Sequence, residues 1–178
     1  MSNLEGILLR PPLLEDGSAT FRLIDSCPPL DMNSRYCNLL QCSHFADTSV
    51  VAEANGEQVG FISGYMLPNR LDTLFIWQVA VAKQARGDGL ASRMLMDIIR
   101  RTQCESVRFI ETTITEDNHA SWALFRGIAQ SLSTQLHYSR WIDRQKHLDN
   151  QHESELLVRI GPITQITEST KSKRNENF

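Results

Sequence analysis

The sequence lacks the features that mark membrane, secreted and nucleic-acid-binding proteins. None of its apolar runs approaches the roughly 20 residues that a membrane-spanning helix needs. Its net charge of −3 offers no basic surface to a nucleic acid or to an anionic membrane. Its first residues show no basic region followed by an apolar core, so we expect no signal peptide and a cytoplasmic location.

Cysteine is scarce, and its spacing excludes the common cysteine motifs. The four cysteines are Cys27, Cys37, Cys42 and Cys104, and no two of them form a C-x-x-C pair. In a cytosolic protein this pattern favours reduced, packed thiols over a disulfide or a zinc site, so we expect no metal.

The remaining composition is that of a globular protein. With 178 residues, of which 41% are hydrophobic, the chain suits one domain with a sizeable core. We expect this domain over residues 1–163. Residues 164–178 have almost no apolar content and are predicted to form a disordered polar tail.

The hydrophobic pattern predicts a mixed α/β domain. Asn55-Gly56 between two strand-like runs is typical of a type I′ hairpin, and a third strand follows to give an antiparallel meander. A helix then connects this third strand to another strand, so those two strands should be parallel. We expect strands near residues 7–10, 49–54, 58–67, 73–81, 106–113, 136–141 and 155–160, and a polar loop at 143–150. One helix should follow Asp16, and a second should begin with Asp31 or Asn33 as its N-cap. Two more helices are expected at 90–101 and from 116–118 onward.

A glycine loop joins strand 73–81 to helix 90–101. The loop is Gln84-Ala-Arg-Gly-Asp-Gly89, and the helix follows it directly. The glycines let an anion approach the backbone, and the unpaired N–H groups and the dipole at the helix N-terminus favour negative charge. The spacing is neither G-x-x-x-x-G-K-[ST] nor G-x-G-x-x-G, so the two common nucleotide-binding loops are absent.

The spacing Gln84-x-x-Gly87-x-Gly89 resembles the pyrophosphate-binding loop of the GNAT acetyltransferase family, and the order of elements is similar to that family's over about residues 7–160. The resemblance implies the GNAT acyl-CoA N-acyltransferase fold, an α/β fold with a mixed, mostly antiparallel sheet flanked by helices. It also implies acetyl-CoA as co-substrate, held where the fourth and fifth strands diverge. The implied acetyl-CoA contacts are Val79, Val81, Gln84, Arg86, Gly87, Asp88, Gly89, Leu90 and Ala91.

A second motif of that family begins the helix after the fifth strand. Family members have an asparagine there, followed by a Leu-Tyr or Leu-Phe pair, and this sequence has Asn118 and then Leu124-Phe125. A tyrosine at the place of Phe125 can protonate the leaving thiolate, whereas phenylalanine cannot. Asn118 and Ser121 are the nearby polar alternatives, and together with Phe125 they are expected to contact acetyl-CoA.

Four longer phrases resemble a narrower family, the L-2,4-diaminobutyrate acetyltransferases of ectoine biosynthesis. They span residues 27–34, 75–81, 111–121 and 157–162. The resemblance implies that the 4-amino group of L-2,4-diaminobutyrate attacks the thioester of acetyl-CoA directly. It also implies a homodimer.

Such a reaction needs a proton acceptor, because an amine attacks a thioester only as the free base. Glu155, which begins the last strand, and Asp31 are the candidate catalytic residues, and Glu111 on the fifth strand is their rival. Each has an ordinary alternative role, as an edge, capping or structural carboxylate. The expected substrate contacts are Asp31, Arg35, Tyr36, Trp77, Glu111, His152 and Glu155.

The strand period places some of these residues relative to one another. Trp77, Val79 and Val81 should share one strand face, with Trp77 either in the wall of the acceptor pocket or in the core. Tyr36 should face the core from its helix. His152 is expected to bind the substrate carboxylate or relay a proton, near Asp31 across the slot; the alternative is an exposed loop histidine without a role in the site.

Other functions stay open from the sequence alone. A related acetyltransferase would act on another small diamine, a polyamine or an amino acid. A non-catalytic acyl-CoA sensor is a second alternative, because Phe125 replaces tyrosine. A nucleotide-binding module lacks its Walker lysine, and a protein acetyltransferase lacks an accessory recognition domain.

Overall fold

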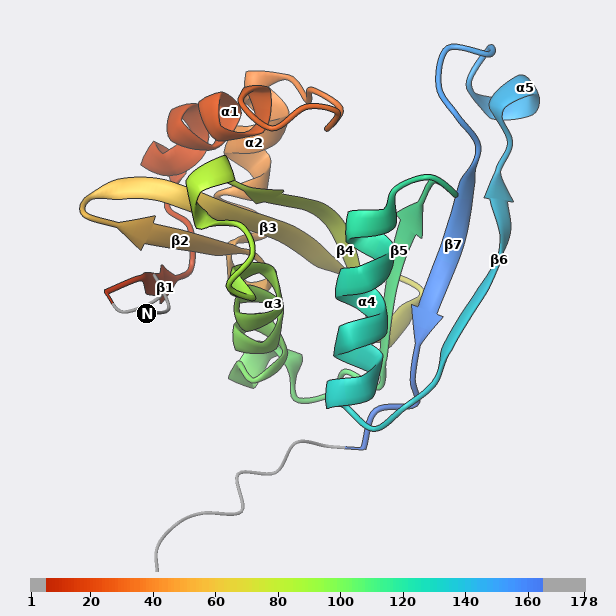
Figure 1. Ribbon diagram of the computed structural model, residues 1–178. Coiled ribbons are helices and arrows are strands. Elements are labelled where there is room, and N and C mark those ends of the chain that lie inside the picture. Colours follow the sequence, from red (N-terminus) through yellow and green to blue (C-terminus); the bar gives the residue numbers. More distant parts are fainter. Residues whose placement is uncertain (1–5, 165–178) are drawn as a thin grey trace, which may run out of the picture.

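The computed structural model describes residues 6–164, and a seven-stranded sheet runs through them (Figure 1). The strands are β1 (Leu8–Arg10), β2 (Val50–Ala54), β3 (Glu57–Leu67), β4 (Arg70–Val81), β5 (Phe109–Ile114), β6 (Leu136–Ile142) and β7 (Glu155–Ile160). Their order in the sheet is β1-β2-β3-β4-β5-β7-β6. All neighbours are antiparallel except β4 and β5, which are parallel as predicted.

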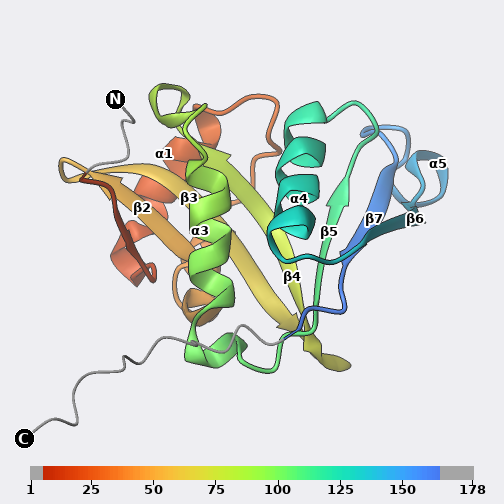
Figure 2. The ribbon, with the colours of Figure 1, turned by 60° about the horizontal axis from the view of Figure 1, so that its bottom comes forward.

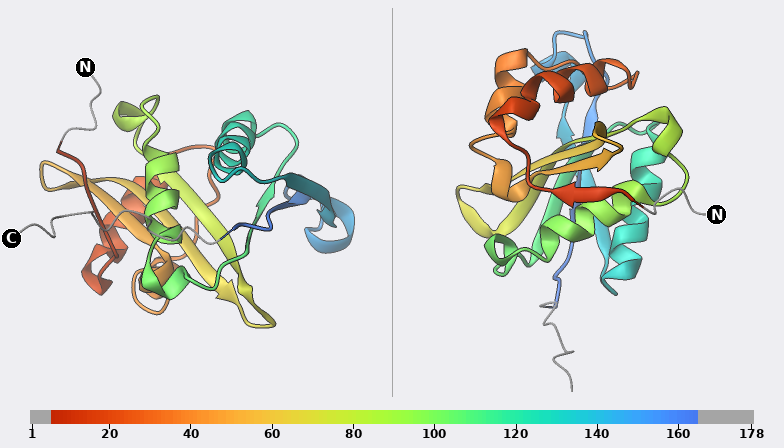
Figure 3. Two further views of the ribbon diagram at one scale, coloured as in Figure 1. Left: turned by 90° about the horizontal axis from the view of Figure 1, so that it is seen from below. Right: turned by 90° about the vertical axis from the view of Figure 1, so that its left-hand side faces the viewer.

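Helices pack on both faces of this sheet. The helices are α1 (Gly17–Asp25), α2 (Arg35–Gln41), α3 (Leu90–Ile99), α4 (His119–Ser131) and α5 (Arg144–His147), with short 3₁₀ helices η1 (Leu14–Asp16), η2 (Ala46–Thr48), η3 (Lys83–Ala85) and η4 (Thr102–Cys104). α1 and α2 lie over β2 to β4 on one face, and α3 and α4 lie on the opposite face (Figures 2 and 3). The helices thus enclose the core, with Leu90, Met94 and Ile98 of α3 buried at helical spacing.

The α1/α2 layer leaves part of its face of the sheet open. Among the described residues, no helix covers β5, β7 and β6 on that side (Figure 3). The hairpin of β6 and β7, with α5 in its connection, extends beyond the end of β5 (Figure 1). This open face and this hairpin border the site described below.

The element order agrees with the prediction, and the hairpin turn is the expected one. Asn55 and Gly56 have φ values of 52° and 77°, as a type I′ turn requires at both central positions. Two details of the prediction were wrong. Ser34, not Asp31 or Asn33, is the N-cap of α2, because Ser34 Oγ accepts the hydrogen bond from the Cys37 N–H at 3.1 Å.

The predicted polar loop at 143–150 contains the helix α5. The Asp143 carboxylate accepts hydrogen bonds from the backbone N–H groups of Gln145 and Lys146, and so begins the helix. These backbone bonds also lower the pKa of Asp143. Asp143 as an N-cap was therefore the signal for a helix, and the polar composition of this segment led to the wrong prediction of a loop.

Several further expectations concern the chain as a whole. Within residues 6–164, no helix is long and apolar enough to cross a membrane, and no three His, Cys, Asp or Glu side chains are grouped as a metal site. All four cysteines are free, and Cys27, Cys42 and Cys104 are buried, as predicted. The predicted disordered tail lies outside the described residues, except for Thr164.

Candidate active site

β4 and β5 pair over only three residues and then diverge. Their parallel ladder begins at Thr73 with Phe109 and ends at Phe75 with Glu111. β4 continues to Val81 alongside β3, and β5 continues alongside β7 (Figure 2). Beyond the ladder, the facing edges of the two strands therefore carry backbone groups without a strand partner. This is the slot that was expected between the fourth and fifth strands.

The glycine loop follows the end of β4 and begins α3. Gly87 and Gly89 have φ values of 97° and 78°, and a Cβ added at either would meet no protein atom within 4 Å. No side chain caps α3, so the N–H groups of Leu90 and Ala91 point out of the helix without a capping oxygen. Open space beside the backbone, N–H donors and the positive helix end together fit a pyrophosphate group.

Arg86 links this loop to the end of β4. Its Nε donates a hydrogen bond of 2.8 Å to the carbonyl of Val81, which also accepts one from the Cys27 thiol at 3.4 Å. Gln84 and Asp88 are exposed beside it. The predicted loop residues therefore lie together around the slot, with the guanidinium of Arg86 directed back over the strand.

The start of α4 carries the second predicted motif. Asn118 is the N-cap of this helix, since its Oδ1 accepts the hydrogen bond from the Ser121 N–H at 3.1 Å. Phe125 is buried in the core. The Ser121 hydroxyl makes no hydrogen bond within the part of the chain that the structure describes. Of the two polar alternatives to a tyrosine, Asn118 is thus engaged in capping, whereas Ser121 is available.

A β-bulge in β4 sets the direction of Trp77. Gln78 and Ile76 lie opposite the consecutive residues Ser63 and Gly64 of β3, so Trp77 is the extra residue of β4. A bulge interrupts the alternation of side chains along a strand. Trp77 and Gln78 consequently both lie on the sheet face that carries α1 and α2.

The prediction that Trp77 shares a face with Val79 and Val81 was therefore wrong. Val81 lies opposite Gly60, where an added Cβ would point toward α3, and Val79 shares that face by the strand period. The Trp77 ring instead lies 6.4 Å from the ring of Tyr65, on the α1/α2 side.

Trp77 belongs to a row of aromatic rings on that side. The Tyr65 ring contacts the rings of Phe45, Phe75 and Trp77 at centroid distances of 5.3 to 6.4 Å. The Phe75 ring also lies 6.4 Å from that of Trp141, although two strands separate β4 from β6 in the sheet. The end of β6 therefore curls over the open face. Trp77 is 43% exposed, so it borders open space instead of filling the core.

The two ends of the domain meet across the slot, as predicted. His152 Nδ1, in the loop before β7, lies 3.6 Å from Asp31 Oδ1, in the loop between α1 and α2. Their side chains are 55% and 76% exposed. A contact this exposed is weak, so a bound ammonium group can compete for the Asp31 carboxylate.

Glu111 is held by two arginines. It is 2% exposed, and its carboxylate accepts hydrogen bonds from Arg70 at 2.7 and 2.8 Å and a further one from Arg159. The same carboxylate raises the pKa of Arg70. Both oxygens of this carboxylate are therefore occupied by guanidinium groups, which leaves neither of them free for a substrate amine. The contacts of Glu111 thus support a structural role for this carboxylate, the alternative to a role as proton acceptor.

Glu155 has a different environment. It is half-buried, and within residues 6–164 its carboxylate makes no hydrogen bond and no ion pair. It also lines a cavity of about 740 Å³ between the loop after β5, the end of β6 and the β6–β7 connection. The cavity suits a ligand with charges of both signs, because acidic and basic side chains line it. These charged residues are Glu116, Asp117, Arg140, Asp143, Lys146, His147, Glu153 and Glu155.

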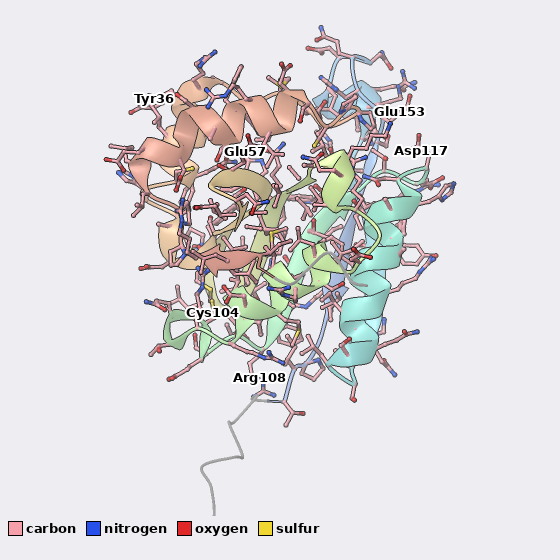
Figure 4. All side chains as sticks on the ribbon, turned by 60° about the vertical axis from the view of Figure 1, so that its left-hand side comes forward. Tyr36, Glu57, Cys104, Arg108, Asp117 and Glu153 are labelled. Atoms are coloured by element: carbon pink, nitrogen blue, oxygen red, sulfur yellow. The ribbon has the colours of Figure 1, made fainter. Side chains whose placement is uncertain are left out.

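Two predicted substrate contacts do not reach the slot in this chain. Tyr36 is 70% exposed, so the prediction that it faces the core was wrong. Figure 4 shows it on the outside of the α1/α2 layer, far from Glu153 and Asp117, which lie near each other at the cavity. The Arg35 guanidinium lies over the Phe21 ring, with 4.3 Å between Cζ and the ring centroid.

Gln78 is a residue that the sequence interpretation overlooked. It is 7% exposed, and its Oε1 accepts a hydrogen bond of 2.8 Å from Asn33 Nδ2, while its Nε2 donates one of 3.3 Å to the Asp31 carbonyl. The available signal was a glutamine within the apolar run Phe75–Val81. A buried amide needs partners, so it predicts a polar contact at that level of the strand.

Comparisons with known proteins agree with this geometry. The sequence profile described as the acetyltransferase (GNAT) family matches residues 16–128. An L-2,4-diaminobutyric acid acetyltransferase from Methylotuvimicrobium alcaliphilum is 52% identical over 160 residues, which are 90% of this chain and 93% of that protein. An L-2,4-diaminobutyric acid acetyltransferase from Halomonas elongata is 45% identical, and the match covers 88% of this chain and 82% of that protein.

Solved structures give the same result. The diaminobutyrate acetyltransferase of Paenibacillus lautus, in complex with its substrate L-2,4-diaminobutyric acid and coenzyme A, has a TM-score of 0.84 and 40% identity. The match covers 88% of this chain and 95% of that one. The ribosomal-protein-S18-alanine N-acetyltransferase of Escherichia coli, at 16% identity and a TM-score of 0.66, shares the fold.

Proposed function

The chain belongs to the acetyltransferase (GNAT) family, and from this premise we propose how its site works. Its activity is that of a diaminobutyrate acetyltransferase, with acetyl-CoA as the acetyl donor. We propose that the 4-amino group of L-2,4-diaminobutyrate receives the acetyl group. The product, N4-acetyl-L-2,4-diaminobutyrate, would then serve the synthesis of the osmoprotectant ectoine.

Glu155 is the proton acceptor in this proposal. The observation that carries the assignment is the difference between the contacts of the three candidate carboxylates. Glu111 is paired with Arg70 and Arg159, and Asp31 faces His152, but the Glu155 carboxylate has no partner among the described residues and lines the cavity. Glu155 takes one proton from the 4-ammonium group, and the free amine then forms the C–N bond at the thioester carbonyl.

Asp31, His152 and Trp77 hold the rest of the acceptor. The Asp31 carboxylate attracts the 2-ammonium group, and His152 beside it donates to the substrate carboxylate. Trp77 forms a wall on the open face of the sheet, next to the Tyr65 and Phe45 rings. Holding one amine at Asp31 presents the other amine to the thioester, which is how the site distinguishes the two.

The slot and the glycine loop hold acetyl-CoA, which supplies the activated acetyl group. The N–H groups of Leu90 and Ala91, at the start of α3, bind the pyrophosphate next to Gly87 and Gly89. Backbone groups of Val79 and Val81 bind the pantetheine arm. When the C–S bond breaks, the nitrogen releases its second proton and the thiolate takes up one proton. The Ser121 hydroxyl is the group at α4 that can pass this proton on to the thiolate, because Phe125 has no hydroxyl.

Initial rates with a series of amines test the proposed acceptor. Release of CoA thiol would be measured with diaminobutyrate, ornithine, lysine and putrescine. We expect diaminobutyrate to have the highest kcat/KM. A higher value with another amine would support the alternative acetyltransferase, and no thiol release with any amine would support the non-catalytic sensor.

We also propose a homodimer in the cytoplasm. Tyr138 and Trp141 are exposed on the edge strand β6, which presents aromatic surface and an edge without a strand partner among the described residues. The four free cysteines fit a reducing compartment. Light scattering on the protein as it elutes from a size-exclusion column would give the mass of two chains if the dimer forms.

A further inference from the structure

The loop between α1 and α2 has few contacts that hold it over the slot. Leu30 packs against the core on one side of Asp31, and Ser34 begins α2 on the other. Between them, Asp31 and Met32 are exposed. An exposed segment without packing is mobile unless hydrogen bonds fix its backbone.

Gln78 provides those hydrogen bonds. The bulge at Trp77 turns Gln78 toward this loop. Its amide oxygen accepts from the Asn33 side chain at 2.8 Å, and its amide nitrogen donates to the Asp31 carbonyl at 3.3 Å. Since Gln78 is 7% exposed and lies on a central strand, it is a rigid anchor for the more exposed loop.

We propose that Gln78 is a positioning residue that sets the distance between the Asp31 carboxylate and the reaction centre, and thereby the chain length of the diamino acid that is acetylated. This inference rests on the proposed function, in which Asp31 binds the 2-ammonium group. Gln78 itself touches neither substrate in this scheme. It acts through the backbone of Asp31 and the side chain of Asn33.

The chemistry of the acceptor explains why this distance matters. In diaminobutyrate the two nitrogens are separated by three carbons, and in ornithine by four. If the Asp31 carboxylate holds the 2-ammonium group, only one of these chain lengths places the second amine at the thioester. A misplacement of about 1 Å costs on the order of 100-fold in rate, so a loosened loop should penalise the shorter substrate most.

The two hydrogen bonds of Gln78 can be removed separately. Gln78→Leu removes both, whereas Gln78→Glu keeps an acceptor for Asn33 and loses the donor to the Asp31 carbonyl. Asn33→Ala removes only the hydrogen bond between Asn33 and Gln78, and the fold should tolerate this change because Asn33 is partly exposed. Gln58→Leu is the matched control, because Gln58 Nε2 on β3 donates a similar hydrogen bond of 2.9 Å to the Thr20 hydroxyl of α1, and within residues 6–164 its side chain makes no hydrogen bond to Asp31 or Asn33.

Steady-state rates with diaminobutyrate and with ornithine would be measured for each folded variant. We expect kcat/KM for diaminobutyrate to fall on the order of 100-fold in Gln78→Leu and on the order of tenfold in Gln78→Glu and Asn33→Ala. The preference for diaminobutyrate over ornithine should fall in the same order, with the KM for acetyl-CoA within about twofold of wild type. Gln58→Leu should change only the thermal stability.

An unchanged preference between the two substrates in Gln78→Glu and Asn33→Ala would overturn the proposal. An equal loss with both substrates together with a raised KM for acetyl-CoA would also overturn it, because that pattern indicates general damage to the fold. If Gln78→Leu does not fold, the two milder variants decide the question. A wild-type enzyme that does not acetylate diaminobutyrate would instead refute the proposed function.

Discussion

Replacement of Glu155 by glutamine tests the proposed proton acceptor. Glutamine has nearly the same shape but cannot take a proton. Because the Glu155 carboxylate makes no hydrogen bond or ion pair within residues 6–164, its replacement leaves no described side-chain partner unsatisfied. We therefore expect the free energy of unfolding to change by less than about 0.5 kcal/mol, as for a surface substitution.

The loss of rate follows from the pKa of the amine. An amine with the usual lysine pKa of about 10.4 is only about 0.4% unprotonated at pH 8. Without a base, the variant depends on this fraction, so its kcat/KM for diaminobutyrate should be about 250-fold below wild type at pH 8. At pH 10 about 30% of the amine is already unprotonated, and the difference should shrink to about fourfold.

The assay is the release of CoA thiol at saturating acetyl-CoA across this pH range. Glu153→Gln is the matched control, because Glu153 is only two residues away, lines the same cavity and is 63% exposed in its pair with Arg144. It should retain at least half of the wild-type rate, since an exposed ion pair contributes about 1 kcal/mol or less. A deficit in Glu155→Gln that stays constant with pH would refute the role of Glu155 as base.

Three further predictions concern the loop, the buried carboxylate and the acid stability. Gly87→Val should raise the KM for acetyl-CoA roughly 10- to 100-fold, since each lost hydrogen bond to a charged group is worth about 1.5–3 kcal/mol. The control is Gly56→Val, at a similar positive φ in the β2–β3 turn, which should lower the melting temperature without that change in KM. Glu111→Gln should lower the free energy of unfolding in urea by roughly 1.5–3 kcal/mol, because it removes the charge from the buried end of its hydrogen bonds to the partly exposed Arg70 and Arg159. An unchanged urea midpoint of unfolding would contradict the structural role of Glu111. Hydrogen bonds from Arg10 lower the pKa of Asp16. The contribution of Asp16 to stability is therefore present above a pH of about 4 and is lost as the pH falls through the lowered pKa. Asp16→Asn should lose less stability than wild type between pH 5 and pH 2, and an acid dependence equal to that of wild type would contradict this.

Local signals in the sequence were sufficient for much of the fold. The Asn55-Gly56 turn, the strand-like runs on either side of it and the period of α3 each depend on residues close in the chain, so they could be predicted. The loop Gln84–Gly89 was found for the same reason. The placement of β7 between β5 and β6 could not be predicted, because strand order depends on contacts between distant segments.

The site was less predictable than the fold. The partners of Glu111 lie 41 and 48 residues away, at Arg70 and Arg159, and no local pattern connects them. The bulge at Trp77 shifts the strand period by one residue, which is why a simple alternation gave the wrong face. Asp31 and His152 were correctly expected to meet, because both were assigned to the acceptor site from opposite ends of the domain.

The position of the acetyl group in the product tests the central claim most directly. Diaminobutyrate and acetyl-CoA labelled with ¹³C in the acetyl group would be incubated with the enzyme, and the product would be examined by two-dimensional NMR for a coupling from the labelled carbonyl to the carbon that bears the amide. The account predicts a correlation to the C4 methylene, which identifies N4-acetyl-L-2,4-diaminobutyrate. A correlation to the C2 methine instead, or no acetylated product, would contradict it.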